Sequence, residues 1–307
     1  MDRPREVTND WKRGIRMQFR TDLALEKQEA LVSPCKGVKS DRLDLGPATI
    51  TRIEVLNEEG AKAIDRPVGN YITIEMPAFS DDTNMDDDCR TAISVELSRL
   101  LPKEGLILVV GLGNDDITPD ALGPQAAERI LATRHISGEL ARSVGLGDLR
   151  PVAAVAPGVL GKTGIEVAEI LDGMVQQIHP AAVIVIDALA SRQLSRLGCT
   201  VQLSDTGIRP GSGVGNTRKE ISKETIGVPV VSMGVPTVVD AVTLASDLLG
   251  SDGTEAIRKT DQSGRDMMVT PREIDLVIER AAALVALAIN CTLHPHLSAQ
   301  ELLEIMA

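Results

Sequence analysis

Aromatic residues are almost missing from this sequence, since phenylalanine, tryptophan and tyrosine together make up 1% of its 307 residues. The hydrophobic fraction is nevertheless 43%, which is typical of a globular protein rather than a disordered one. The core must therefore be built from valine, isoleucine, leucine, alanine and methionine. Such a core suits a buried parallel sheet flanked by helices, whose strands read as unbroken aliphatic runs.

An excess of basic charge is also lacking, because the formal net charge is -12 at pH 7. Nucleic-acid binding requires a basic patch, so the composition argues against direct contact with DNA or RNA. The four cysteines lie far apart and form no CxxC pair: Cys35, Cys89, Cys199 and Cys291. This spacing predicts reduced thiols in a cytosol-like compartment.

The sequence shows neither a secretory signal nor an apolar run long enough to cross a bilayer. Residues 1–20 are charged and lack the apolar core of a signal peptide. The apolar run AAALVALAI at 281–289 is too short to span a membrane. We therefore expect a cytoplasmic protein that makes no membrane contact.

Strand-like and helix-like segments alternate from residue 105 onward. Four aliphatic runs read as buried strands, at 106–113, 152–157, 181–189 and 228–234. Helical patterns follow them, the last being TVVDAVTLASDLL at 237–249. This rhythm predicts an α/β fold with a mostly parallel, doubly wound sheet flanked by helices. Residues 49–76 read as a strand–helix–strand unit, which we expect to form a small antiparallel extension.

Two carboxylates follow strands of this predicted sheet, where ligand sites of such sheets lie. Asp120 belongs to the turn GLGNDDITPDALGP at 111–124, in which Thr118 and Pro119 predict a helix start. Asp187 closes the aliphatic run VIVID. Each residue alone is explained by helix-end electrostatics or a turn cap. Together they predict a pair in which one carboxylate activates water and the other protonates the leaving amide nitrogen.

Other catalytic patterns have less support. The turn at 111–124 lacks the third glycine of GxGxxG, and Asp115 and Asp116 would repel a pyrophosphate. No HExxH or GxSxG motif is present. The tripeptide Asp205-Thr206-Gly207 matches pepsin-like enzymes, but those are all-β proteins. We therefore interpret Asp205 as a loop residue near the cleft.

The glycine-rich loop at 204–220 carries three basic residues, Arg209, Arg218 and Lys219. A solvated surface loop would have the same composition, although loops of this length are often functional. Basic side chains near a carboxylate pair would suit an acidic side chain of a substrate. We predict that these three residues, with Asp205, contribute to substrate binding.

Six blocks of the sequence resemble the germination protease family of spore-forming Firmicutes, also called spore protease. They are GLGNDDITPDALGPQ, APGVLGKTGIE, VIVIDALASR, SDTGIRPGSGVGNTRKEIS, VPVVSMGVPTVVDA and MMVTPREID. The resemblance implies a fold similar to that of the hydrogenase maturation endopeptidases. It also implies an aspartic-type endopeptidase with Asp120 and Asp187 as catalytic residues, and a homotetramer that needs no cofactor. The implied substrates are small, acid-soluble, DNA-binding spore proteins, which are degraded during germination.

The resemblance also gives the N-terminal segment a role, because the family's enzymes are made as zymogens in the developing spore. Family substrates are cut after the acidic residue of a Thr-Glu-apolar-Ala-x-acidic stretch, and residues 21–26 (TDLALE) are similar. An amphipathic surface helix would explain the same letters. We predict self-cleavage between Asp22 and Leu23, with a pro-segment 1–22 and a peptidase domain 23–307. We expect the segment to be accessible in the precursor.

Two alternatives remain open at the level of sequence. A metal-dependent maturation-type endopeptidase of the same fold would also place acidic residues at Asp120 and Asp187. The histidine that serves as third ligand in those enzymes has no obvious counterpart, which favours a site without metal. A peptidase-like scaffold that only binds peptides would share the fold without the chemistry.

Overall fold

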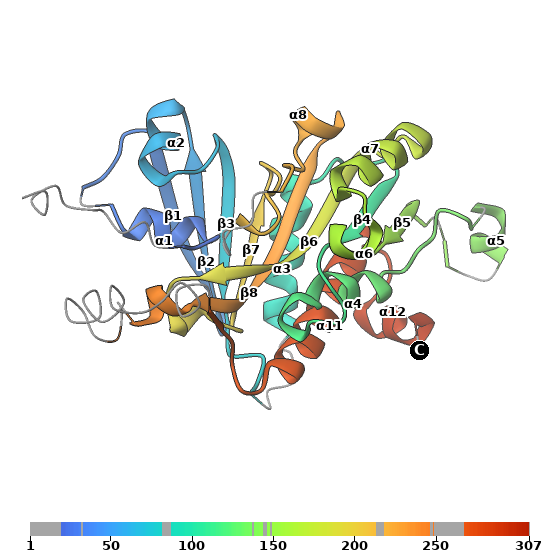
Figure 1. The fold of residues 1–307 in the computed structure, drawn as a ribbon. Helices are drawn as coiled ribbons and strands as arrows, with labels where there is room; N and C mark the ends of the chain where they lie inside the picture. Colours follow the sequence, from blue (N-terminus) through green and yellow to red (C-terminus); the bar gives the residue numbers. More distant parts are fainter. Residues whose placement is uncertain are drawn as a thin grey trace, which may run out of the picture.

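The computed structural model describes residues 20–31, 33–81, 87–136, 138–143, 146–147, 149–212, 218–245, 248 and 267–306. Its centre is a sheet of nine strands in the order β1-β2-β3-β7-β8-β6-β4-β5, with β9 paired to β8 (Figure 1). The strands are β1 Val38–Leu45, β2 Ala48–Val55, β3 Gly69–Glu75, β4 Ile107–Gly111, β5 Val152–Val155, β6 Ala182–Ser191, β7 Thr200–Ser204, β8 Val230–Asp240 and β9 Met268–Val269. The described helices are α1 Ala24–Glu29, α2 Glu58–Ile64, α3 Asp87–Leu100, α4 Leu122–Glu128, α5 Gly138–Ser143, α6 Leu160–Thr163, α7 Val167–Ile178, α8 Lys223–Ile226, α11 Ile274–Leu293 and α12 Ala299–Met306, with 3-10 turns at Thr118–Asp120 and Leu194–Arg196.

The sheet has a parallel half and an antiparallel half. Strands β8, β6, β4 and β5 are parallel neighbours. Strands β1, β2, β3 and β7 are antiparallel neighbours, and β7 joins the halves by pairing antiparallel with β8. The predicted α/β class, with a helix-flanked sheet, is confirmed. The antiparallel part is larger than residues 49–76, because β1 and β7 also belong to it.

One face of the sheet carries the largest core. Helices α3, α4 and α11 cover this face, and their aliphatic side chains pack on alternate residues of the strands, such as Ile184 and Ile186 of β6. Helix α11 is long and apolar enough to cross a membrane, but 61% of its most apolar stretch is buried inside the protein. This burial is typical of a core helix.

The opposite face has two smaller cores with a gap between them. Helices α7 and α8 cover the parallel half, packing on Val183 and Val185 of β6. Helices α1 and α2 cover the antiparallel half, packing on Ile53 of β2 and Tyr71 of β3 (Figure 1). The middle strands β7, β8 and the end of β6 therefore present an uncovered stretch of this face, and the candidate site lies there.

Two local predictions were wrong. Residues 237–240 continue β8 instead of starting a helix, because Val238 and Val239 pair with the end of β6 after a register shift. Thr118 does not cap a helix either. Residues 118–120 form a separate 3-10 turn, and α4 begins only at Leu122 without a side-chain cap.

Candidate active site

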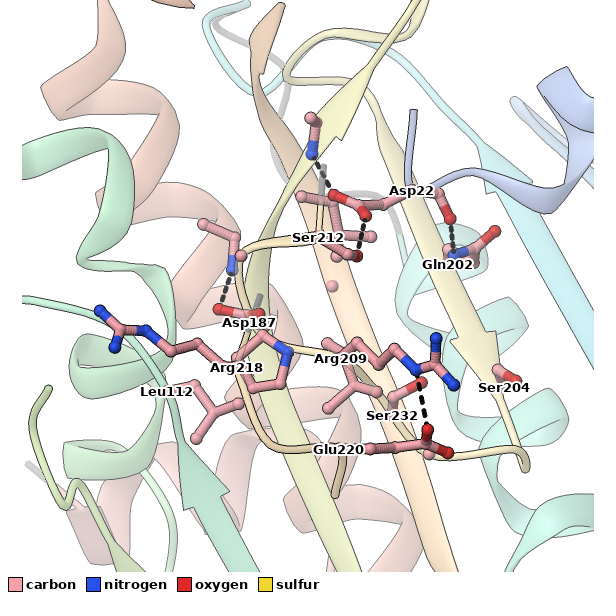
Figure 2. A pocket seen from close by; sticks show the side chains of 18 of the residues that line it. Asp22, Leu112, Asp187, Gln202, Ser204, Arg209, Ser212, Arg218, Glu220 and Ser232 are labelled. Atoms are coloured by element: carbon pink, nitrogen blue, oxygen red, sulfur yellow. Dashed lines mark hydrogen bonds and ion pairs between the residues drawn. The ribbon is translucent and has the colours of Figure 1, made fainter. Parts of the chain in front are cut away.

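A cleft of about 1340 Å³ lies between the two cores of the second face. It gathers the carboxyl end of β4, the end of β6, the middle of β7 and β8, and the segment before α1 (Figure 2). The polar residues that line it include Asp22, Asp120, Asp187, Gln202, Ser204, Arg209, Ser212, Arg218, Lys219, Glu220 and Ser232. The structure thus brings Asp120 and Asp187 to one cleft, at the edge that the sequence pattern indicated.

The floor of the cleft is a row of residues in register across four strands. Thr73 of β3 pairs with Gln202 of β7, Gln202 pairs with Gly234 of β8, and Gly234 pairs with Asp187 of β6. Residues in register point to the same face of a sheet, so Gln202 and Asp187 face the cleft on either side of Gly234. A Cβ at Gly234 would lie 2.6 Å from both the carbonyl oxygen of Asp187 and Cγ of Leu189. Gly234 has no side chain, and the side chain of Leu189 lies over it.

Asp187 is a buried carboxylic acid with one hydrogen bond from the backbone. Its side chain is 6% exposed, and Oδ1 accepts the N–H of Ala188 at 3.0 Å. Burial raises the pKa of Asp187 well above its usual value, and the charges of Asp120 and Asp22 raise it further. A buried acid among like charges favours its protonated form.

Asp120 reaches the cleft from the turn that follows β4. Its Oδ2 accepts the N–H of Asn114 at 2.9 Å, and its carbonyl oxygen accepts the same N–H at 3.2 Å. Gly113 permits this tight turn, because it adopts a φ of +120° and a Cβ there would lie 1.9 Å from the Asp120 carbonyl oxygen. Partial burial raises the pKa of Asp120, and the Asn114 hydrogen bond opposes the rise. Asp120 is the less buried acid of the pair.

The segment 20–24 lies in the cleft and is bound to the end of β6. Asp22 donates its N–H to the carbonyl oxygen of Ala190 at 2.8 Å, and Ala190 donates its N–H to Oδ2 of Asp22 at 2.8 Å. Ser212 donates its hydroxyl to Oδ1 of Asp22 at 2.9 Å (Figure 2). The side chains of Leu23 and Ala24 are fully buried. The expectation of an accessible segment was therefore wrong, because the apolar residues that follow Asp22 pack into the protein.

Glu26 fixes the far end of this segment. Its carboxylate is 3% exposed and accepts the backbone N–H groups of Arg192 at 2.7 Å and Gln193 at 2.9 Å. The hydroxyl of Thr21 also donates to it. The guanidinium of Arg196 lies 3.6 Å from the same carboxylate. The buried acid is therefore hydrogen-bonded and partly neutralised, which offsets the cost of its burial.

The three predicted basic residues line the cleft, although two of them contact other acids. Nε of Arg209 lies 2.7 Å from Glu220, and Nη1 of Arg218 lies 3.8 Å from Glu166. Lys219 is exposed at the same rim. Their role in substrate binding stays a prediction.

Asp205 lies at the end of β7 but is not among the residues that line the cleft. Its carboxylate accepts the backbone N–H of Asn70 at 2.8 Å and the side-chain Nδ2–H at 2.7 Å. These bonds tie the end of β7 to β3. The contacts of Asp205 are thus structural, and the structure does not bring it to the carboxylate pair.

Two residues of the cleft floor, Gln202 and Gly234, were missed by the sequence reasoning. A signal for Gln202 was present, because Thr200, Gln202 and Ser204 alternate with apolar residues as in a strand with one polar face. No local pattern marks Gly234, which lies within an aliphatic run. Its importance depends on its neighbours in the sheet.

Comparison with known proteins identifies the family. A sequence model of the germination protease family matches residues 18–251. The chain belongs to the germination protease family. It is 39% identical to the germination protease of Clostridium perfringens strain 13, over 92% of this chain and 97% of that protein. It is 41% identical to that of Caldanaerobacter subterraneus subsp. tengcongensis, over 95% of this chain and 99% of that protein.

Membership of the germination protease family means that the chain is a spore germination endopeptidase, as the sequence blocks indicated. A solved structure, the [NiFe] hydrogenase maturation protease HycI from Thermococcus kodakarensis, aligns with a TM-score of 0.36 and 20% identity. The alignment covers 63% of this chain and 98% of that one.

The maturation endopeptidases raise the question of a metal. In the described part of the chain, no group of three or more His, Cys, Asp or Glu side chains is placed to hold a metal ion. The arrangement that is present is a pair of carboxylates with raised pKa values.

Proposed function

We propose that this endopeptidase begins the degradation of small, acid-soluble, DNA-binding spore proteins, as a homotetramer in the cytoplasm of the spore. Membership of the germination protease family supports this role. The observation that carries the chemistry is the pair Asp120 and Asp187, which share a cleft with a bound acidic segment of the chain. An acidic residue bound beside two carboxylates supports cleavage after acidic residues.

In the proposed reaction, the ionised carboxylate of Asp120 accepts a proton from water. The water oxygen then attacks the carbonyl carbon of the bond to be cut. Asp187 in its protonated form donates a proton to the departing amide nitrogen, and the C–N bond breaks. Burial decides which carboxyl group is the acid and which is the base. Asp187 is the more buried of the two, and its pKa is raised well above the usual range. One carboxyl group is protonated and the other ionised when the reaction starts.

The position of residues 20–24 supports the zymogen. The segment lies in the cleft that a substrate would need. The N–H of Asp22 binds Ala190 of β6, and the carbonyl oxygen of the Asp22–Leu23 bond accepts from Gln202 of β7. Self-cleavage at this bond would separate the pro-segment 1–22, of which residues 1–19 lie outside the described residues. The mature chain would then begin at Leu23 and would have to release or rearrange this segment to admit a substrate.

The zymogen is tested by N-terminal sequencing of the chain after incubation. We expect Leu23 as the new N-terminus in the parent, and an intact chain in Asp187→Asn and Asp22→Lys. Addition of a chelator should leave the rate of self-cleavage unchanged, because the proposed reaction uses no metal. A different mature N-terminus would contradict the proposed site, and full activity of the uncut chain would contradict the zymogen.

A further inference from the structure

Gln202 binds the two peptide groups that flank Leu23, the first of which is the proposed cleavage site. Its Nε2 donates to the carbonyl oxygen of Asp22 at 3.0 Å (Figure 2). Its Oε1 accepts the N–H of Ala24 at 2.7 Å. These are bonds to the backbone alone, of the kind that a neighbouring β-strand makes. The same amide could therefore bind any extended peptide in the cleft, whatever its side chains.

The position of Gln202 relative to Asp187 suits a reaction at this carbonyl. The two residues lie in one register row with Gly234 between them. Neighbouring strands are about 4.8 Å apart, so the backbones of Gln202 and Asp187 are separated by roughly 10 Å. Strand β8 lies between them, with Gly234 at the middle position. A peptide in the cleft would have the amide of Gln202 on one side and the carboxylates on the other.

We propose that Gln202 stabilises the oxyanion that forms at the carbonyl of the bond being cut. The inference rests on the proposed function, since it assigns a role in that same reaction. When water adds to the carbonyl carbon, its double bond to oxygen becomes single and the oxygen gains negative charge. The Nε2–H of Gln202 donates to this oxygen throughout and transfers no proton. The charge is lost again when the carbonyl re-forms and the C–N bond breaks.

Nε2 of Gln202 lies 3.0 Å from the carbonyl oxygen of Asp22 in the uncut chain, and this oxygen is the atom that would become the oxyanion. Donors that stabilise an oxyanion lie about 2.7–3.1 Å from it, and removal of one typically lowers kcat by about 10²–10³-fold. Gln202 is buried, so the hydrogen bond forms with little competition from water. Its Oε1 is held by the N–H of Ala24, which orients the amide so that Nε2 faces the carbonyl oxygen. The hydrogen bond from Ala24 therefore positions the amide of Gln202.

The test compares Gln202→Glu with the parent in steady-state cleavage of a small acid-soluble spore protein. The introduced carboxylate keeps an acceptor for the N–H two residues beyond the carbonyl but has no donor for the oxyanion. We expect kcat near neutral pH to fall by about 10²–10³-fold, with a smaller change in KM. Lowering the pH protonates the introduced carboxyl and restores a donor. The ratio of variant to parent kcat should therefore rise as the pH falls.

Gln176→Glu is the matched control, because it makes the same change on the exposed side of α7, where Gln176 donates to Asp172. Its kcat should equal that of the parent. A Gln202→Glu variant with parental kcat, or with a kcat ratio that does not change with pH, would overturn the inference and leave the proposed function standing. Failure of the parent to cut the spore protein would overturn both.

Discussion

Replacing Asp187 with asparagine should stabilise the uncut protein at neutral pH while abolishing cleavage. Burial raises the pKa of Asp187 well above its usual value, with further contributions from the charges of Asp120 and Asp22. Asparagine has nearly the same shape, and its Oδ1 can still accept the N–H of Ala188. The substitution therefore removes the ionisable group and leaves the packing in place.

The sign of the effect follows from proton linkage. The folded protein binds the Asp187 proton more tightly than the unfolded chain does, so ionisation of this group lowers the free energy of unfolding. The penalty is present above the folded pKa and disappears as the pH falls toward about 3.9, the ordinary value for aspartate. One pKa unit corresponds to about 1.4 kcal/mol. We therefore expect Asp187→Asn to raise the free energy of unfolding by on the order of 1 kcal/mol or more. Each kcal/mol corresponds to about 2–4 °C in Tm.

The assay is thermal unfolding of the uncut chains between pH 4 and pH 8. The Tm of Asp187→Asn should exceed that of the parent by little at the acidic end, and the difference should grow as the pH rises. Asp44→Asn, at an exposed carboxylate of β1, is the control for removal of a charge. Equal stability of Asp187→Asn and the parent across this range, or a gain that grows toward acid, would refute the reasoning that burial raises the pKa.

Three further substitutions test other parts of the site. Gly234→Ala should lower activity and should lower the free energy of unfolding by about 1–3 kcal/mol, because its Cβ would clash with the Asp187 carbonyl oxygen and the Leu189 side chain. A parental melting curve would contradict this. Arg196→Met should cost roughly 3 kcal/mol in urea unfolding, because it leaves the buried carboxylate of Glu26 without its cation. A cost within 0.5 kcal/mol, on the order of a typical surface change, would argue against it. The substitutions Arg209→Gln, Arg218→Gln and Lys219→Gln each neutralise one basic residue of the rim, and each should reduce cleavage after acidic residues more than it reduces stability. An unchanged preference for acidic residues in all three variants would contradict this prediction.

The carboxylate pair could be predicted from sequence because parallel strands deliver their carboxyl ends to one edge. Asp120 and Asp187 each follow an aliphatic run, and that alone indicated a shared cleft. Gln202 could not be placed in the same way, because β7 is short and antiparallel, and it reaches the site through pairing with β8. The sequence also did not show which surface covers Leu23. Apolar residues in a sequence predict burial but do not identify the surface that covers them. Here Leu23 and Ala24 are buried, which contradicts the expected accessibility of the segment.

The most direct test of the central claim is cleavage of a purified small acid-soluble spore protein, with mass mapping of the fragments. The parent should cut after an acidic residue, and Asp120→Asn and Asp187→Asn should each fold normally but lose most of the turnover. Near-parental turnover in either variant would contradict the assignment of the carboxylate pair. Fragments that do not end in an acidic residue would contradict the proposed specificity.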